Sequence, residues 1–239
     1  MRLFILILFI SSSVIAQTKP YVKVTYRAKR LVPIDYKKIT NSQIRTVLQG
    51  KEAILNDLDF KLTACKDTYF FKYVEGLDLN GESRSAASLA GGTDVFYRRD
   101  TIHFRQNCSY GECLNITLEK NRFSEWKITD EQKIILGYTC FKAIAYQSKI
   151  VNNLSTKQQR IVAWFTPELN FHAGPQGLDE LPGLVLEGSV NDLYTFYAKE
   201  IVLEDNCKEI EVPEKGKTLT KEEYDQVTID MLKLIKSRG

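Results

Sequence analysis

Residues Thr93 to Tyr146 read TDVFYRRDTIHFRQNCSYGECLNITLEKNRFSEWKITDEQKIILGYTCFKAIAY. Short runs rich in aromatic and β-branched residues alternate here with turn residues such as Arg99-Asp100 and Ser109-Tyr110-Gly111, a pattern typical of strands. No helix-length pattern separates these runs. Hairpins therefore join the strands, and we expect an antiparallel sheet.

The same pattern extends over most of the chain. Tyr21–Tyr26 alternates like a strand, and Asp59–Ala64 and Thr68–Val74 flank Lys66-Asp67 as a hairpin. Turn residues also occur at Thr129-Asp130 and Asn152-Asn153. The later expected strands are Val95–Arg98, Thr101–Phe104, Cys113–Leu118, Ser124–Ile128, Gly137–Tyr146, Arg160–Phe165, Leu184–Val190 and Tyr194–Leu203.

Helices are expected on either side of the strands. Asn41–Asp57 carries apolar residues at mostly helical spacing. Residues 213–219 form a charged linker, and a capping box at Thr220 opens an amphipathic helix over residues 220–237. Gly76–Gly92 is predicted to be a loop. We expect a mainly β (α+β) fold, a curved antiparallel sheet or half-barrel in one β-rich domain spanning residues 17–239.

The first residues have the layout of a signal peptide. Met1–Ala16 has a basic start at Arg2, an apolar run over Leu3–Ile10 and small residues before Ala16. We predict cleavage near Ala16 and export of a chain without a transmembrane span, because no other apolar run is long enough to cross a membrane. The composition is globular, and the formal net charge of +3 for the whole chain excludes a strong electrostatic nucleic-acid binder.

The chain has five cysteines, and an odd number leaves at least one without an intramolecular partner. Cys108 and Cys113 flank a short connection between two expected strands. A hairpin of that length brings the Cα atoms to the roughly 5.5–6 Å separation of a disulfide, so we predict this bond. The pairing of Cys65, Cys140 and Cys207 stays open, with Cys140–Cys207 as the working assignment.

Patterns for metal binding and nucleophilic catalysis are sparse. A metal site of His103 with Cys108 and Cys113 would need a fourth ligand, and the usual zinc spacings are absent. Only His103 and His172 could serve as an imidazole base, and the sequence has no G-x-S-x-G elbow.

The paired carboxylates have turn-like contexts. Asp130-Glu131 and Asp179-Glu180 are each adjacent in sequence, and we expect both pairs to be solvated. We therefore predict no catalytic residue, cofactor or metal site. The alternative is a metal-handling protein or a hydrolytic enzyme that uses His103 and nearby cysteines.

The two tryptophans are more informative. Trp126 and Trp164 each lie in an expected strand together with Phe and Tyr residues. Such rings usually form core or cross-strand pairs. The alternative is an aromatic-lined concave face that holds an apolar ligand or peptide.

Two segments carry a family resemblance. Residues 126–143 read WKITDEQKIILGYTCFKA, and residues 163–187 contain AWFTPE, GP and LPGLVLE in this order. They resemble the GLPGLI family, exported envelope proteins of Gram-negative bacteria without an established activity, over Lys120 to Ile201. Glu180 replaces the first Gly of the motif and Val185 the final Ile. By analogy, the segment order implies a half-barrel like that of periplasmic lipoprotein carriers.

The resemblance implies a location in the periplasm or at the periplasmic face of the outer membrane. Leu181-Pro182-Gly183-Leu184 suits a type II turn before a strand, and it is either a structural corner or a partner surface. We predict a non-enzymatic binding or accessory protein of the cell envelope that engages an apolar ligand, a peptide, a lipid or an outer-membrane protein. The candidate surface consists of Trp126, Trp164, Leu181, Pro182, Gly183 and Leu184.

Overall fold

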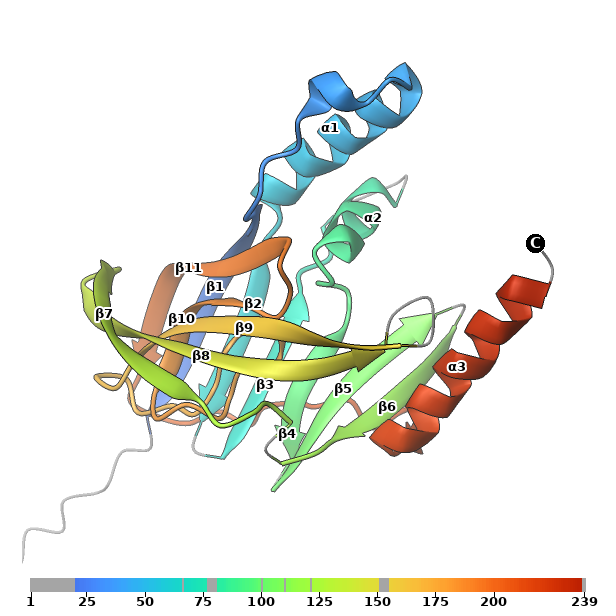
Figure 1. Cartoon of the computed structure of the whole chain (residues 1–239). Coiled ribbons are helices and arrows are strands. Elements are labelled where there is room, and N and C mark those ends of the chain that lie inside the picture. The colour runs from blue at the N-terminus through green and yellow to red at the C-terminus, as the bar shows by residue number, and fades with distance from the viewer. Residues whose placement is uncertain are drawn as a thin grey trace, which may run out of the picture.

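The computed structural model describes residues 20–65, 67–76, 81–99, 101–109, 111–120, 122–150 and 155–237. In these ranges the chain forms one 12-stranded sheet with helices at its rim (Figure 1), which confirms the predicted mainly β fold. The elements are β1 (Tyr21–Arg30), η1 (Tyr36–Lys38), α1 (Ser42–Asp57), β2 (Phe60–Cys65), β3 (Thr68–Tyr73), α2 (Glu82–Leu89), β4 (Val95–Arg99), β5 (Ile102–Ser109), β6 (Glu112–Leu118), β7 (Lys127–Ile135), β8 (Tyr138–Ile150), β9 (Thr156–Thr166), η2 (Pro175–Gly177), β10 (Leu184–Ser189), β11 (Tyr194–Glu204), β12 (Lys217–Leu219) and α3 (Lys221–Ser237).

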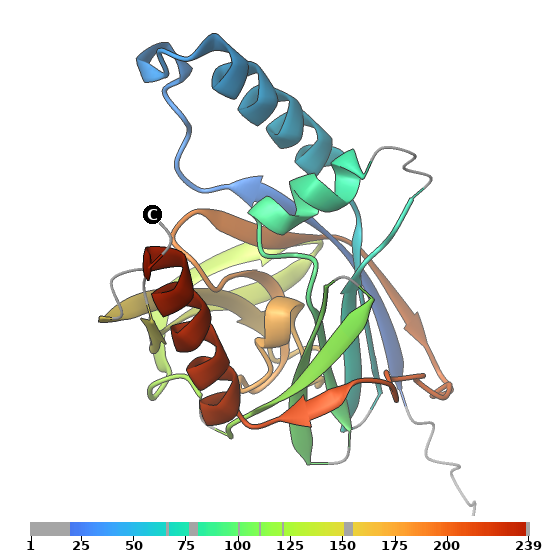
Figure 2. The ribbon, with the colours of Figure 1, turned by 90° about the vertical axis from the view of Figure 1, so that its right-hand side faces the viewer.

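The strand order is β12-β6-β5-β4-β3-β2-β1-β11-β10-β9-β8-β7, and every described pair is antiparallel except β12 with β6. β1 lies between β2 and β11, so it joins the N-terminal and C-terminal halves of the sheet. The sheet curves strongly, as Figures 1 and 2 show from two directions. None of the helices in the described ranges is long and apolar enough to cross a bilayer.

Alternating residues of β1, β2, β3 and β11 form the larger apolar core. The ring centroid of Phe196 lies 4.9 Å from that of Phe60 and 5.8 Å from that of Phe71, in edge-to-face packing. The buried hydroxyl of Tyr26 donates to the carbonyl oxygen of Val185 at 2.6 Å. This hydrogen bond connects β1 to β10 across the core.

The connection between β9 and β10, here called the inner loop (residues 167–183), fills the concave side of the sheet (Figure 2). Its residues Ala173 to Asp179 are all buried. Gln176 Nε2 donates to the carbonyl oxygens of Ala90 at 3.2 Å and Gly91 at 2.9 Å, which fastens the loop to the end of α2. The concave face is thus packed with protein rather than open.

The predicted type II turn at Leu181-Pro182-Gly183-Leu184 is wrong. Gly183 N–H donates to Leu181 O at 2.8 Å, two residues back, which is the hydrogen bond of a γ-turn. Leu184 N–H instead donates to Leu169 O at 3.0 Å, within the inner loop. Packing of the loop on itself therefore takes the donor that a type II turn would use.

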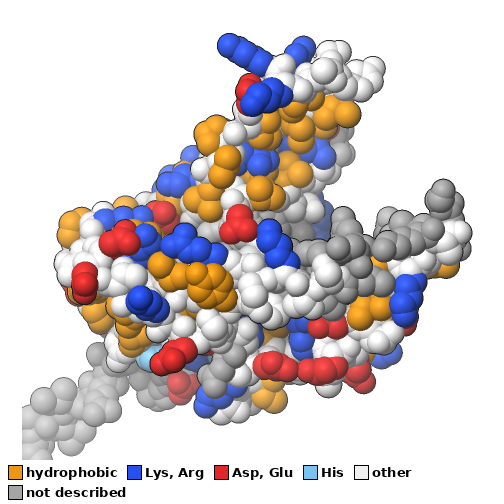
Figure 3. Space-filling view, in the orientation of Figure 1, with side chains coloured by type: hydrophobic (Ala, Val, Ile, Leu, Met, Phe, Trp, Pro, Cys, Tyr) orange, Lys and Arg blue, Asp and Glu red, His pale blue; other side chains and the backbone are white. Residues whose placement is uncertain are grey.

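Both predicted helices form, and the capping box predicted at Thr220 is confirmed. Asn41 Oδ1 accepts from Ile44 N–H at the start of α1. At α3, Thr220 Oγ1 accepts from Glu223 N–H at 3.2 Å, and Glu223 Oε2 accepts from Thr220 N–H at 2.8 Å, as a capping box requires. α1 extends away from the sheet with apolar side chains exposed along it (Figure 3), Ile44 and Val47 among them.

Several local predictions are wrong because contacts between distant segments override the local sequence pattern. The expected loop Gly76–Gly92 contains α2, because Ala86 and Ala87 are fully buried where α2 packs beneath α1. The expected linker 213–219 contains β12, which pairs with β6. The strand expected at Ser124 begins only at Lys127. Thr129-Asp130 lies in β7 at a register shift rather than in a turn, and Asn152-Asn153 lies outside the described residues.

The structure contains two disulfides in its described part. Cys108–Cys113 closes the β5–β6 hairpin, as predicted. The second joins Cys65 to Cys207 with a Cα–Cα distance of 5.7 Å, so the working assignment Cys140–Cys207 is wrong. Tyr21 of β1 pairs with Cys65 on one side and Glu204 on the other, which brings the end of β2 beside the chain that leaves β11. Cys140 is a buried thiol.

We expect the two disulfides to contribute unequally to stability. Cys65–Cys207 spans 142 residues and Cys108–Cys113 spans 5. On the chain-entropy model these closures stabilise by about 5 and about 2 kcal/mol, respectively. In urea unfolding, the free energy of unfolding should fall further in the double variant Cys65→Ala/Cys207→Ala than in Cys108→Ala/Cys113→Ala. Equal losses would contradict the assignment of the long-range bond as the main covalent stabiliser.

Gly183→Ala should destabilise the fold. Gly183 has φ +150°, and a Cβ there would lie 2.2 Å from Thr166 O. Backbone strain and overpacking together should cost about 2 kcal/mol or more. Gly50→Ala is the matched control, because a Cβ added at Gly50 would have no neighbouring atom within 4 Å. Because position 50 lies in the middle of α1, Gly50→Ala should raise the free energy of unfolding by about 0.5–1 kcal/mol in the same denaturation measurement.

Candidate functional site

A pocket with a volume of about 650 Å³ opens at the ends of the β2–β3 and β4–β5 hairpins. The chain that follows β11 forms one wall, held there by the Cys65–Cys207 disulfide. We call it the His103 pocket. Its charged and titratable lining side chains are Arg98, His103, Lys120, Lys208, Asp67 and Glu209.

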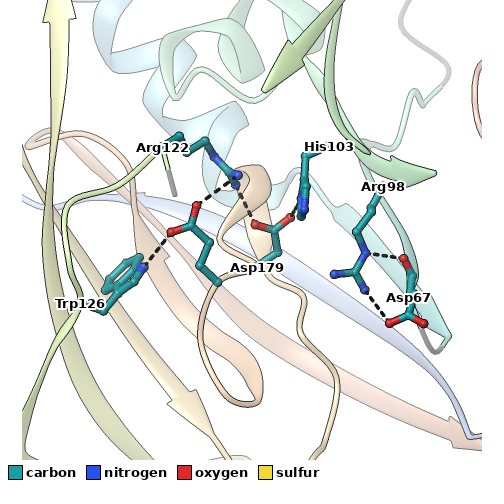
Figure 4. A network of polar contacts seen from close by, with 7 residues as sticks. Asp67, Arg98, His103, Arg122, Trp126 and Asp179 are labelled. Carbon is teal, nitrogen blue, oxygen red and sulfur yellow. Dashed lines mark hydrogen bonds and ion pairs between the residues drawn. The ribbon is translucent and has the colours of Figure 1, made fainter. Parts of the chain in front are cut away.

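His103 lies on β5, where register places it opposite Arg98 of β4 and Leu118 of β6. Its side chain is 13 % exposed, and Nδ1 lies 2.6 Å from Oδ2 of Asp179 (Figure 4). A carboxylate at this distance orients the imidazole and selects the tautomer with a proton on Nδ1. Any contact of the ring with a ligand in the pocket is therefore left to Nε2.

Asp179 is the buried centre of the network. Its side chain has no exposed surface, and its second oxygen, Oδ1, accepts from Arg122 Nη2 at 2.8 Å. Burial alone would raise the pKa of Asp179. The Arg122 charge and the His103 hydrogen bond outweigh burial and hold the pKa below its ordinary value. The carboxylate is thus ionised in the folded protein at neutral pH.

Glu180 extends the network to Trp126. Trp126 Nε1 donates to Glu180 Oε2 at 3.3 Å, and Arg122 Nη1 lies 3.6 Å from Glu180 Oε1. Burial raises the pKa of Glu180 despite the nearby Arg122. The Trp126 ring packs edge-on against Phe123, with centroids 5.4 Å apart. The network therefore joins the inner loop to β5 and to the segment before β7.

The expectation that Asp179-Glu180 is a solvated turn pair is wrong. Asp179 is 3 % exposed because the inner loop turns inward. Arg122 and Asp179 are the residues that sequence reasoning missed. A buried carboxylate has no local signature that separates it from a turn carboxylate. Only the tertiary position of the inner loop brings Asp179 to His103 and Arg122.

The other predicted site residues are dispersed. Trp164 is half-buried on the face of β9 opposite Ile161, Ala163 and Phe165, and Lys133 Nζ lies 4.2 Å from its ring centroid. Trp126 and Trp164 therefore do not share one aromatic face. In the LPGL motif, Leu181 and Leu184 are buried at 1 % and 0 % exposure, Gly183 is buried, and Pro182 is exposed.

The His103 pocket contains only part of the set of groups that nucleophilic catalysis needs. The His103–Asp179 pair resembles the base and orienting group of a triad, but the two lining cysteines are joined in a disulfide. Glycoside hydrolysis needs a carboxylic acid with a raised pKa beside the substrate. The carboxyl with a raised pKa in this region is Glu180, which does not line the pocket.

The alternative metal site of His103, Cys108 and Cys113 does not form, because both sulfurs are in the hairpin disulfide. Across the described ranges, no group of three or more His, Cys, Asp or Glu side chains is placed to hold a metal ion.

These features define a class of protein: a strongly curved single-sheet domain with a filled interior and a polar pocket walled by a disulfide. The family described as N-glycanase peptide, N-terminal domain, matches residues 99–230, more than half of the chain. The chain belongs to this family.

Solved structures share the fold. The chain is similar to PNGF-II in its C2 crystal form, with 16 % sequence identity and a TM-score of 0.52, and in its P21 form, with 16 % identity and a TM-score of 0.51. Each alignment covers 87 % of this chain and 32 % of that chain, so this chain spans about a third of the length of PNGF-II. No curated protein matches the sequence.

Asp179→Asn should destabilise the protein by about 3 kcal/mol, because it leaves the Arg122 charge, 8 % exposed, without its main partner. Folding lowers the pKa of Asp179. The extra free energy of unfolding of the wild type over Asp179→Asn is therefore fully present above the unfolded pKa of about 3.9, and it is lost as the pH falls through the folded pKa. Denaturant titrations at several pH values between acid and neutral measure this difference. Asp67→Asn is the control, since Asp67 is 91 % exposed and should change stability by less than about 1 kcal/mol.

Proposed function

We propose that this chain is an exported, non-enzymatic binding or accessory module of the N-glycanase N-terminal type, and that the His103 pocket holds an anionic group of its ligand. One observation carries the proposal. Arg98, Lys120 and Lys208 line the pocket with His103, and the lining carboxylates are Asp67 and Glu209. Arg98 also pairs with Asp67 at 3.8 Å, and Lys208 pairs with Glu204 at 2.6 Å. The cationic side chains of the lining still outnumber its carboxylates, and they surround a recess rather than an open face.

The geometry of these groups supports anion recognition. Guanidinium and ammonium groups bind carboxylate, sulfate and phosphate oxygens through charge-assisted hydrogen bonds. Asp179 fixes the His103 ring, so Nε2 is presented in a defined direction without a rotamer cost on binding. Lys120 is exposed at the rim, where its charge attracts anions before contact.

The family match and the similar solved structure suggest which ligand class to test first. The family's description names an N-glycanase, and the similar solved structure is PNGF-II. We therefore propose a glycopeptide with an acidic group as the ligand. The chain spans about a third of PNGF-II, so an accessory role alongside further domains or a separate enzyme is part of the proposal.

Other expectations stay proposals. Export through Met1–Ala16 to the periplasm, membership of the GLPGLI family and engagement of an outer-membrane protein, lipid or peptide rest on the sequence. An apolar ligand would need a surface other than the concave face, since the inner loop fills that face.

A second candidate is a hydrolytic enzyme in which His103 acts as the base. The observation that favours it is the 2.6 Å contact between His103 Nδ1 and Asp179. In that case a pocket-bound water would be the nucleophile, with its proton taken by Nε2. The two functions differ in whether the bound glycopeptide is recovered intact.

Calorimetric titration of a sialylated glycopeptide tests the binding function. Lys120→Glu should weaken binding about tenfold or more, equal to about 1.4 kcal/mol, and added salt should weaken wild-type binding. Lys37→Glu makes the same charge change on η1, away from the pocket, and should leave affinity unchanged. The desialylated glycopeptide should bind more weakly than the sialylated one.

Mass spectrometry of the recovered glycopeptide completes the test. An intact ligand supports the binding module. Cleavage by the wild type that disappears in His103→Ala would instead establish the enzyme, and unchanged affinity in Lys120→Glu would rule out the His103 pocket as the anion site.

A further inference from the structure

The first half of α1 and the segment that leads into it project from the body of the molecule (Figures 1 and 2). We call residues 31–51 the α1 arm. The C-terminal end of α1 is anchored, because Leu55 is 1 % exposed in the larger core and Arg30 Nε donates to Glu52 Oε1 at 2.9 Å. The arm therefore stands clear of the sheet on a fixed base.

Large aliphatic side chains of the arm are exposed to solvent. The exposed fractions of Leu31, Val32, Ile44 and Val47 are 45, 61, 53 and 54 %. In α1, Ile44 and Val47 lie at helical spacing with Leu55, so the apolar stripe that the core covers at one end of the helix continues uncovered at the other. Figure 3 shows apolar side chains gathered along this part of the molecule.

The arm is also strongly basic. It contains the four cationic residues Lys37, Lys38, Arg45 and Lys51 and one acidic residue, Asp35, a formal net charge of +3 that equals the net charge of the whole chain. Among the described residues, no carboxylate forms an ion pair with Lys37, Arg45 or Lys51, and the 3.6 Å pair of Lys38 with Asp35 is exposed. The arm thus surrounds its apolar side chains with positive potential.

This combination favours a bilayer surface over a protein partner. Protein–protein interfaces are depleted of Lys, and their buried centres are rich in aromatic residues. The exposed apolar side chains of the arm are instead aliphatic, and cationic residues alternate with them along the chain. Helices that lie in the membrane–water interface carry Lys and Arg beside an apolar face, and anionic lipids attract each such charge near the surface.

We propose that the α1 arm docks on a lipid bilayer with anionic headgroups, with its aliphatic side chains at the acyl boundary and its cations among the headgroup phosphates. The arm leaves the end of β1, whereas Cys65 in the wall of the His103 pocket pairs with Tyr21 at the start of β1. Docking would therefore leave the pocket open at the opposite end of the strands. The inference does not rest on the anion site proposed above.

Co-sedimentation with vesicles tests the docking. The protein is the chain from Gln17 to Gly239, which keeps every described element and lacks the apolar leader that would itself enter lipid. The vesicles are phosphatidylcholine alone and an equal mixture of phosphatidylcholine and phosphatidylglycerol. The expected result is saturable binding to the mixed vesicles, about tenfold or more tighter than to phosphatidylcholine and weakened by added salt.

A first pair of variants tests the apolar contact. Ile44→Ser/Val47→Ser should weaken binding to the mixed vesicles about tenfold or more, because the arm then has less apolar surface to remove from water. Val227→Ser/Met231→Ser is the matched control on α3, where the two side chains are 43 and 61 % exposed, and should bind like the wild type. A circular dichroism melt checks that each variant is folded.

A second pair tests the charges. Lys37→Glu/Lys38→Glu should also weaken binding to the mixed vesicles about tenfold or more, and should change the weak binding to phosphatidylcholine little. Lys157→Glu/Lys199→Glu makes the same charge change at exposed positions on β9 and β11, away from the arm, and should keep wild-type affinity.

The depth of insertion separates docking from mere attraction. In Val47→Trp, the added indole fluorescence should be quenched by bromine-labelled lipid. Absence of this quenching, no binding to the mixed vesicles, or unchanged affinity in Ile44→Ser/Val47→Ser would overturn the proposal. So would a dimer in analytical ultracentrifugation that the same variant dissociates, because a second copy would then cover the arm. A loss in Lys120→Glu equal to that in the arm variants would place the headgroups in the His103 pocket instead.

Discussion

The buried carboxylate of Asp179 is the interaction on which the arrangement of the site depends. Its two oxygens bind groups from different parts of the chain, His103 on β5 and Arg122 before β7, while Asp179 itself belongs to the inner loop. A fully buried carboxylate is costly unless it is paired and hydrogen-bonded. The inner loop can therefore occupy the concave face only in the position where both partners are reached.

The inner loop in turn determines where ligands can bind. Its buried residues occupy the space that an open half-barrel would offer to an apolar molecule. The recess that we propose as a ligand site lies instead at the ends of the β2–β3 and β4–β5 hairpins.

Local features of the fold could be predicted from the sequence. The strand pattern, the caps of α1 and α3 and the Cys108–Cys113 disulfide all depend on residues close together in the chain. The Cys65–Cys207 bond, β12 and the burial of Asp179 depend on partners more than 50 residues away. Those pairings follow from the curvature of the sheet, which no short sequence window specifies.

The Cys65–Cys207 bond also gives the molecule a direction of mechanical strength. A pulling force on the C-terminus acts first on α3 and on β12, which pairs with β6 only over Lys217 to Leu219. Beyond them the force reaches Cys207 and passes through the disulfide to the end of β2, next to β1. The chain between the two cysteines lies in parallel with this covalent link, so tension cannot draw out β3 to β11 while the bond is intact.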